Sequence, residues 1–242
     1  PDLQRGFLLE AARYAEEGED WTAVERLLRQ AVAVEARGAA VPLGPPALLY
    51  WGEAAGGPRR TRWQALDATV EFLNRRERSM DALALYKDLI QQNPRQEELY
   101  EKLASFLEST DMGAEQLRLY QRAIQEFNQP GWFNRLARFY LRKKQVAEYQ
   151  ELCRRVAATF AGSDLQAYIN QVLSQSSSQL GDKPYERFAL EINQAALDRF
   201  PLNPVFRNQI LNLSYRLDMP RHQRLLAAYA MVDSSIRDRY FQ

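Results

Sequence analysis

Residues 100–107 read YEKLASFL, and residues 133–140 read FNRLARFY. In both octapeptides a large residue is followed three positions later by a leucine–alanine pair, and another large residue comes three positions after the alanine. Steps of three and four residues place side chains on one face of a helix. Each octapeptide therefore predicts a helix with a small-residue notch between large side chains, where a neighbouring helix can approach closely.

The spacing of these octapeptides is repeated elsewhere in the chain. The octapeptides start 33 residues apart, since 133 minus 100 is 33. Tyr86 and Tyr120 lie 34 residues apart, at equivalent points of the helices expected before the first octapeptide and between the two. Helical periodicity continues outside this region, for example at Trp21, Val24 and Leu28, and no stretch alternates as a strand would. The sequence predicts an all-α chain with a period of 33–34 residues.

Turn signals divide the chain into helix–turn–helix units. Asp20 and Ser79 precede apolar-periodic stretches and are expected to be N-caps. Asn93-Pro94 and Gln129-Pro130-Gly131 end helices, since proline cannot continue one. These signals predict about six helical hairpins.

The residues quoted above resemble the tetratricopeptide repeat, a helix–turn–helix motif with a W-x2-L-G-x2-Y…A-x3-F…P signature. The resemblance is strong over residues 63–160 and looser over residues 161–242. It implies a right-handed superhelix of antiparallel helical hairpins, a TPR-like α-solenoid. Several positions depart from the signature: Ala104 and Ala137 replace its glycine, Gln116 and Tyr149 replace a small residue, and Cys153 replaces a large aromatic.

Two regions are expected from this division. Residues 1–62 hold an N-terminal helical hairpin and a Pro/Gly-rich connection, 41–62. We expect this connection to pack on the body as a loop or one short helix, and a flexible linker is the alternative. Residues 63–242 hold the TPR-like repeats, with a longer turn at the Ser/Gln-rich tract 174–179. The helical pattern continues to Gln242, which predicts a longer parent protein. The same pattern predicts that the C-terminal helix exposes an apolar stripe through which the chain can self-associate. The residues of this stripe are Leu225, Tyr229, Val232 and Ile236.

Composition removes several classes of chemistry. Lys and Arg number 32 against 31 acids, so the net charge of +1 does not favour a nucleic-acid partner. The single cysteine, Cys153, is expected in the core, and the single histidine, His222, is expected on the surface near a helix start. No phosphate-binding glycine loop is present, and no apolar run is long enough to span a membrane. We expect no catalytic residues, no cofactor and no metal site.

The resemblance implies a non-catalytic protein–protein interaction or scaffold module that binds a peptide or protein surface in its concave groove. Two alternatives remain open: a helical-repeat hydrolase of the α/α-toroid type and a helical-repeat RNA-binding module. The 34-residue period and the absence of convergent acid pairs disfavour the hydrolase, and the acidic residues among the basic clusters disfavour the RNA binder.

The polar positions of the first helix in each pair are expected to face that groove. Asparagine can both donate and accept hydrogen bonds to a peptide backbone, and arginine can bind a carboxylate in bidentate fashion. These residue types predict an acidic or C-terminal peptide as the partner. The predicted groove residues are Asn134, Arg138, Arg142, Asn170, Asn208 and Asn212.

Overall fold

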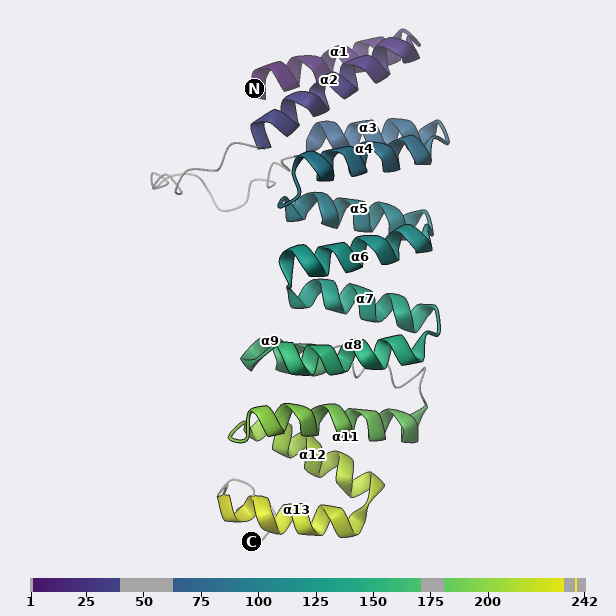
Figure 1. The fold of residues 1–242 in the computed structure, drawn as a ribbon. Helices are drawn as coiled ribbons and strands as arrows, with labels where there is room; N and C mark the ends of the chain where they lie inside the picture. Colours follow the sequence, from purple (N-terminus) through teal and green to yellow (C-terminus); the bar gives the residue numbers. More distant parts are fainter. Residues whose placement is uncertain (1, 40–62, 171–180, 233–237, 239–242) are drawn as a thin grey trace, which may run out of the picture. The chain divides into compact units, whose positions relative to one another are not determined.

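The computed structural model describes residues 2–39, 63–170, 181–232 and 238. Within these ranges the chain forms α-helices and no strand, so the all-α prediction is confirmed (Figure 1). The expectations for residues 41–62 and for the tract 174–179 lie outside the described residues. The helices are α1 (Asp2–Glu17), α2 (Trp21–Ala39), α3 (Gln64–Arg75), α4 (Ser79–Gln92), α5 (Glu97–Ser109), α6 (Gly113–Phe127), α7 (Pro130–Arg142), α8 (Val146–Thr159), α9 (Gly162–Tyr168), α11 (Asp182–Arg199), α12 (Pro204–Leu217) and α13 (Met219–Val232).

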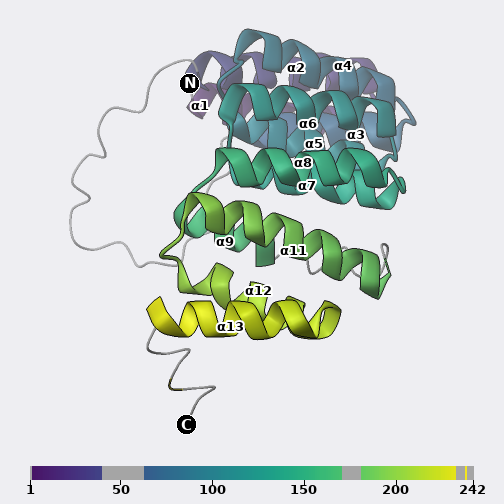
Figure 2. The same cartoon turned by 60° about the horizontal axis from the view of Figure 1, so that its bottom comes forward.

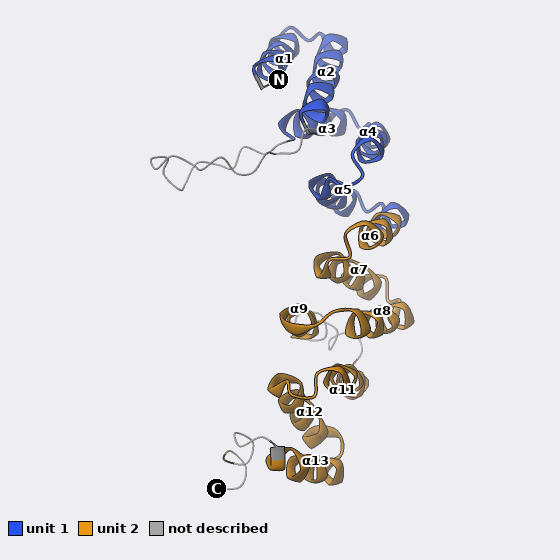
Figure 3. Ribbon diagram, turned by 60° about the vertical axis from the view of Figure 1, so that its left-hand side comes forward, with its two compact units in different colours: residues 1–116 blue, residues 117–242 orange. Residues whose placement is uncertain are grey.

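The chain divides into two compact units, residues 1–116 and residues 117–242 (Figure 3). The division falls inside α6, so it interrupts neither a hairpin turn nor a linker. Consecutive helices in each unit run antiparallel (Figure 1). The described chain is thus a TPR-like succession of helical hairpins, as its sequence pattern predicts.

In the first unit, the small-residue notch is buried as expected. Tyr100 and Ala104 are completely buried in α5, with Leu103 and Leu107 also inside the core. Gln116, which replaces a small signature residue, is buried as well and donates its Nε2 hydrogen to the Leu107 carbonyl at 2.5 Å. The Leu107 carbonyl, in the last turn of α5, also accepts the Met112 N–H at 3.3 Å, so Gln116 adds a second bond at a helix end whose carbonyls lack intrahelical donors.

The first hairpin is joined to the second by a buried carboxylate. The Glu35 side chain, in α2, is only 2% exposed. It accepts hydrogen bonds from the backbone N–H groups of Ala65 at 2.8 Å and Leu66 at 3.2 Å. These are donors of the first turn of α3, which have no partner within their own helix. Glu35 therefore caps α3 from a neighbouring helix.

In the second unit, α7 packs against α8 and α9, and α8 packs against α11 (Figures 1 and 2). Phe133 and Ala137 are completely buried in α7. Arg199, the last residue of α11, donates Nη1 hydrogens to the carbonyls of Ala157 and, at 2.8 Å, Phe160. A cation at the C-terminal carbonyls of α8 also complements the helix dipole.

The turns inside the hairpins share one backbone feature. Glu77, Asp111 and Lys144 follow the first helix of successive hairpins, and their φ angles are +58°, +49° and +58°. Their spacings of 34 and 33 residues reproduce the sequence period, since 111 minus 77 is 34 and 144 minus 111 is 33. The left-handed region costs a residue with a Cβ atom roughly 1–2 kcal/mol. The repeat thus fixes a turn geometry for which glycine is better suited than the residues present.

Lys144→Gly is therefore expected to raise the free energy of unfolding by about 1 kcal/mol, because glycine has no Cβ penalty at this φ angle. Lys144→Ala removes the same charge but keeps the Cβ atom, so it should give no such gain. Chemical denaturation of both variants measures the difference, and equal stabilities for the two would contradict the strain assigned to this turn.

The N-cap predictions have mixed outcomes. The Asp20 prediction is confirmed, because its Oδ1 accepts the Ala23 N–H at 3.0 Å. The Ser79 prediction is wrong: Ser79 is already the first residue of α4, and Arg78 occupies the cap position without a side-chain cap bond. The left-handed turn at Glu77 places Arg78 there, and its guanidinium pairs with Glu25 at 2.6 Å and Asp81 at 2.5 Å.

Candidate functional site

Three of the predicted groove residues lie on α7, and we call them the α7 stripe: Asn134, Arg138 and Arg142. They follow one another at steps of four residues, so they share one side of the helix. Both arginines are exposed, and Asn134 is half-buried. The side of α7 away from the Phe133–Ala137 packing face therefore presents two cations, while the Oδ1 atom of Asn134 is buried.

The stripe arginines differ from Arg154 and Arg216, two exposed arginines of this unit that form ion pairs, and resemble Arg187 and Arg224, which form none in the described ranges. Arg154 pairs with Glu191 at 2.7 Å, and Arg216 pairs with Glu186 at 3.3 Å. Within the described ranges, Arg138 and Arg142 form no ion pair with another residue. Their guanidinium groups are thus available for an external carboxylate.

The other predicted groove residues lie at α12 and beyond the end of α9. Asn208 is half-buried and Asn212 exposed, four positions apart on α12. Asn170 is exposed, and its Oδ1 accepts a hydrogen bond from Gln209 Nε2 at 2.7 Å. This bond places Asn170 beside α12. The short helix before Asn170, α9, packs on α7.

Cys153 lies in the core, as expected. It is 1% exposed, and its Sγ lies 3.8 Å from the Tyr168 hydroxyl. Burial raises the pKa of the thiol to about 11. A protonated thiol is a poor nucleophile at neutral pH, so the surroundings of Cys153 favour packing.

The expectation of a surface position for His222 is wrong, because this residue is only 8% exposed. Its Nδ1 lies 3.0 Å from the Leu211 carbonyl oxygen, and its ring meets Tyr215 edge-on at 5.3 Å between centroids. A carbonyl only accepts, so Nδ1 carries the proton of this bond. The packing of α13 on α12 encloses the side chain, and His222 joins these two helices.

The apolar stripe expected on the C-terminal helix is only partly described. Leu225 and Tyr229 are half-buried on α13. The side chain of Val232 and the whole of Ile236 lie outside the described residues. Self-association through this helix stays a prediction.

The described ranges contain neither a metal-binding cluster nor a membrane-spanning helix. There, no three His, Cys, Asp or Glu side chains come close enough together to hold a metal ion. None of the helices in that part of the chain combines the length and apolar character that a membrane span requires.

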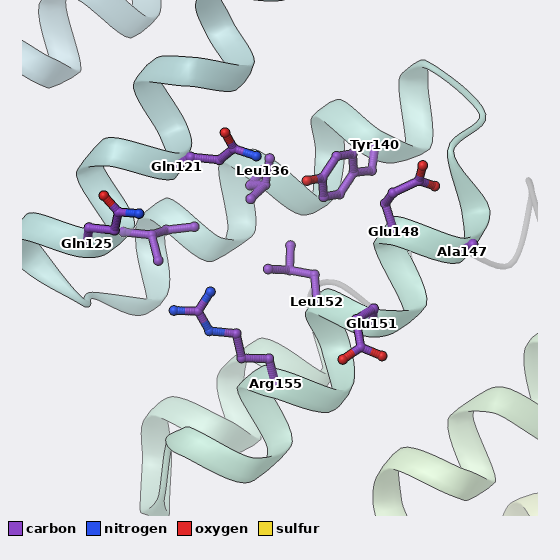
Figure 4. A pocket seen from close by; sticks show the side chains of 10 residues that line it. Gln121, Gln125, Leu136, Tyr140, Ala147, Glu148, Glu151, Leu152 and Arg155 are labelled. Carbon is purple, nitrogen blue, oxygen red and sulfur yellow. The ribbon is translucent and has the colours of Figure 1, made fainter.

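A second candidate site lies on the opposite side of α7, and we call it the α6–α8 groove (Figure 4). At about 100° per residue, Leu136 and Tyr140 project roughly opposite to Asn134 and Arg138. The groove has a volume of about 780 Å³. Its floor is formed by Ile124, Leu136, Tyr140 and Leu152, and its polar rim by Gln121, Gln125, Glu148, Glu151 and Arg155.

The sequence pattern did not predict this groove. Glu148 and Glu151 are visible in the sequence only as interruptions of a basic cluster, and nothing local associates them with Gln121 or Gln125 on α6. A groove between two helices depends on how both pack on a third, which periodicity within single helices does not specify.

Comparison with known proteins gives no family assignment. No protein-family model and no curated protein sequence matches the chain. Among solved structures, the chain is similar to a tetratricopeptide repeat protein from Parabacteroides merdae, with a TM-score of 0.41 and 12% identity over 95% of this chain and 79% of the other. The description of this chain as TPR-like therefore rests on its own hairpins, its 33–34-residue spacing and its buried signature positions.

Proposed function

We propose that the chain is a non-catalytic interaction module and that the α7 stripe binds an acidic or C-terminal segment of a partner protein. The observation that carries the proposal is the pair Arg138 and Arg142, exposed one helical turn apart and without an ion pair in the described ranges. Two guanidinium groups at this spacing can bind neighbouring carboxylates, and such charge-assisted bonds are stronger than neutral ones.

The asparagines extend the proposed surface. Asn134 precedes the arginines on α7, while Asn208 and Asn212 present carboxamides on α12, next to Asn170. Carboxamides can bond both N–H and C=O groups of an extended backbone. We assign the arginines to the charge of the partner segment and Asn170, Asn208 and Asn212 to its main chain, because the Oδ1 atom of Asn134 is buried.

Arg138→Glu/Arg142→Glu is expected to weaken binding of an acidic peptide by about tenfold or more, because it replaces charge-assisted bonds by repulsion. The probe is a fluorescein-labelled Gly/Ser peptide carrying several glutamates and a free C-terminal carboxylate, titrated by fluorescence anisotropy. Raising the salt from about 50 to about 300 mM should weaken wild-type binding, since exposed charges are screened. Comparison with the C-terminally amidated peptide gives the part of the binding free energy that the terminal carboxylate contributes.

Arg187→Glu/Arg224→Glu is the matched control, because it changes the net charge equally at exposed arginines of α11 and α13. It should leave the affinity close to that of the wild type. Equal affinities for the wild type and the α7 double variant, with folding intact by circular dichroism, would overturn the proposal. So would tighter binding of an RNA oligonucleotide that is lost in the same double variant.

A further inference from the structure

We propose that the α6–α8 groove is a second docking site, and that its occupant is an amphipathic helix of a protein partner with an acidic and a basic side chain two turns apart. This site is separate from the α7 stripe, because it lies on the opposite side of α7. The inference rests on the distribution of charge along the groove and on the direction of one arginine.

The first observation is that Arg155 does not use the glutamate best placed to pair with it. Glu151 precedes Arg155 by four residues on α8, the favourable order for an ion pair within a helix. Glu151 instead lies 3.5 Å from Arg154. The guanidinium of Arg155 extends across the groove toward Gln121 and Gln125 of α6 (Figure 4).

Arg155 and these two carboxamides form one end of the groove. The guanidinium offers five N–H donors, and each glutamine adds an amide donor, a set suited to a carboxylate. The Arg155 side chain also lies over the Phe133 ring, with 5.4 Å from Cζ to the ring centroid. This contact restrains the arginine without neutralising it, so the end keeps its positive charge.

The other end of the groove is acidic. Glu148 lies near Tyr140 there, whereas Glu151, between Glu148 and Arg155 on α8, is directed away from Tyr140 and lies 3.5 Å from Arg154 (Figure 4). Both glutamates are exposed. A carboxylate beside an aromatic ring suits a lysine or arginine, whose stem can pack on the ring while its charge meets the acid.

The geometry sets the spacing of the partner's charges. Glu148 and Arg155 are seven residues apart on one helix, or about 10.5 Å at 1.5 Å per residue. A partner helix in the groove places its positions i and i+7 at the same separation. Its positions i+3 and i+4 then face the floor formed by Leu136 and Leu152, where leucine-sized side chains fit. Charge complementarity thus specifies an acid and a base at i and i+7, in either order, because the helix can lie in either direction.

The experiment uses the 242-residue chain and three fluorescein-labelled helical peptides, with leucines at i+3 and i+4. One peptide carries Glu and Lys at i and i+7, the second Lys at both positions, and the third Glu at both. The wild type should bind the mixed peptide most tightly. Arg155→Glu makes the groove acidic at both ends and should weaken the mixed peptide by about tenfold while favouring the Lys/Lys peptide. Glu148→Lys/Glu151→Lys should favour the Glu/Glu peptide.

Two controls keep the result interpretable. Arg155→Gln removes the charge without reversing it and retains a long polar side chain. It replaces Arg155→Glu in the test if that variant perturbs folding. Arg138→Glu/Arg142→Glu should leave mixed-peptide binding unchanged, which separates this site from the proposed function. The proposal is overturned if the wild type binds none of the three peptides, or if the groove variants keep the wild-type order of preference.

Discussion

Replacing Glu35 with alanine is expected to lower the free energy of unfolding by about 2–4 kcal/mol, because two buried backbone donors lose their acceptor and each unmade bond costs roughly 1–3 kcal/mol. The donors are the N–H groups of Ala65 and Leu66, both residues being completely buried. The loss should appear in chemical denaturation as a lower midpoint.

Glu35→Gln is the matched control, since it retains one acceptor oxygen and should lose less stability than alanine. Burial raises the pKa of Glu35 above its ordinary 4.5. The folded chain thus binds this proton more tightly than the unfolded chain. The contribution of the carboxyl to stability is then greatest below pH 4.5 and falls as the pH rises through the raised value. As the pH rises through this range, the wild type should lose stability, whereas Glu35→Gln has no proton to lose there. The difference in free energy of unfolding between the two should therefore shift in favour of Glu35→Gln. Equal losses for alanine and glutamine would contradict the capping role.

Ala137→Leu is expected to destabilise the second unit by about 1–3 kcal/mol, because the notch has no room for three additional carbon atoms. Ala137 is completely buried on α7, between the large side chains of Phe133 and Tyr140 along the same face. Thermal unfolding followed by circular dichroism gives the shift in midpoint.

Ala158→Leu provides the same change of side chain at an exposed position of α8. It should shift the midpoint little, which separates overpacking from any general effect of an added leucine. If Ala137→Leu unfolds at the wild-type temperature, the close helix approach is not at this residue.

The helices and their buried faces could be predicted because they depend on local periodicity. The leucine–alanine pairs at 103–104 and 136–137 lie at three- and four-residue steps from large residues, and the structure buries all four. The same period appears in the left-handed turns at Glu77, Asp111 and Lys144, although none of these residues is a glycine that would announce it. Repetition therefore carried more information than the residue type at any one turn.

Contacts between helices distant in sequence could not be predicted in this way. Glu35 caps a helix that begins 29 residues later, and it looks like any other glutamate on a helix in the sequence. The position of His222 near a helix start predicts a surface side chain, whereas packing of α13 on α12 encloses it. The α6–α8 groove needs three helices to form. Each case depends on tertiary packing, which the pattern within one helix does not encode.

Chemical-shift mapping shows whether the α7 stripe binds an acidic segment of a partner. The isotope-labelled chain is titrated with the glutamate-rich peptide, and the backbone amides and arginine Nε–H signals are followed. We expect the largest changes at Asn134, Arg138 and Arg142. At saturating peptide, unchanged signals for these three residues, or changes confined to the α6–α8 groove, would contradict it.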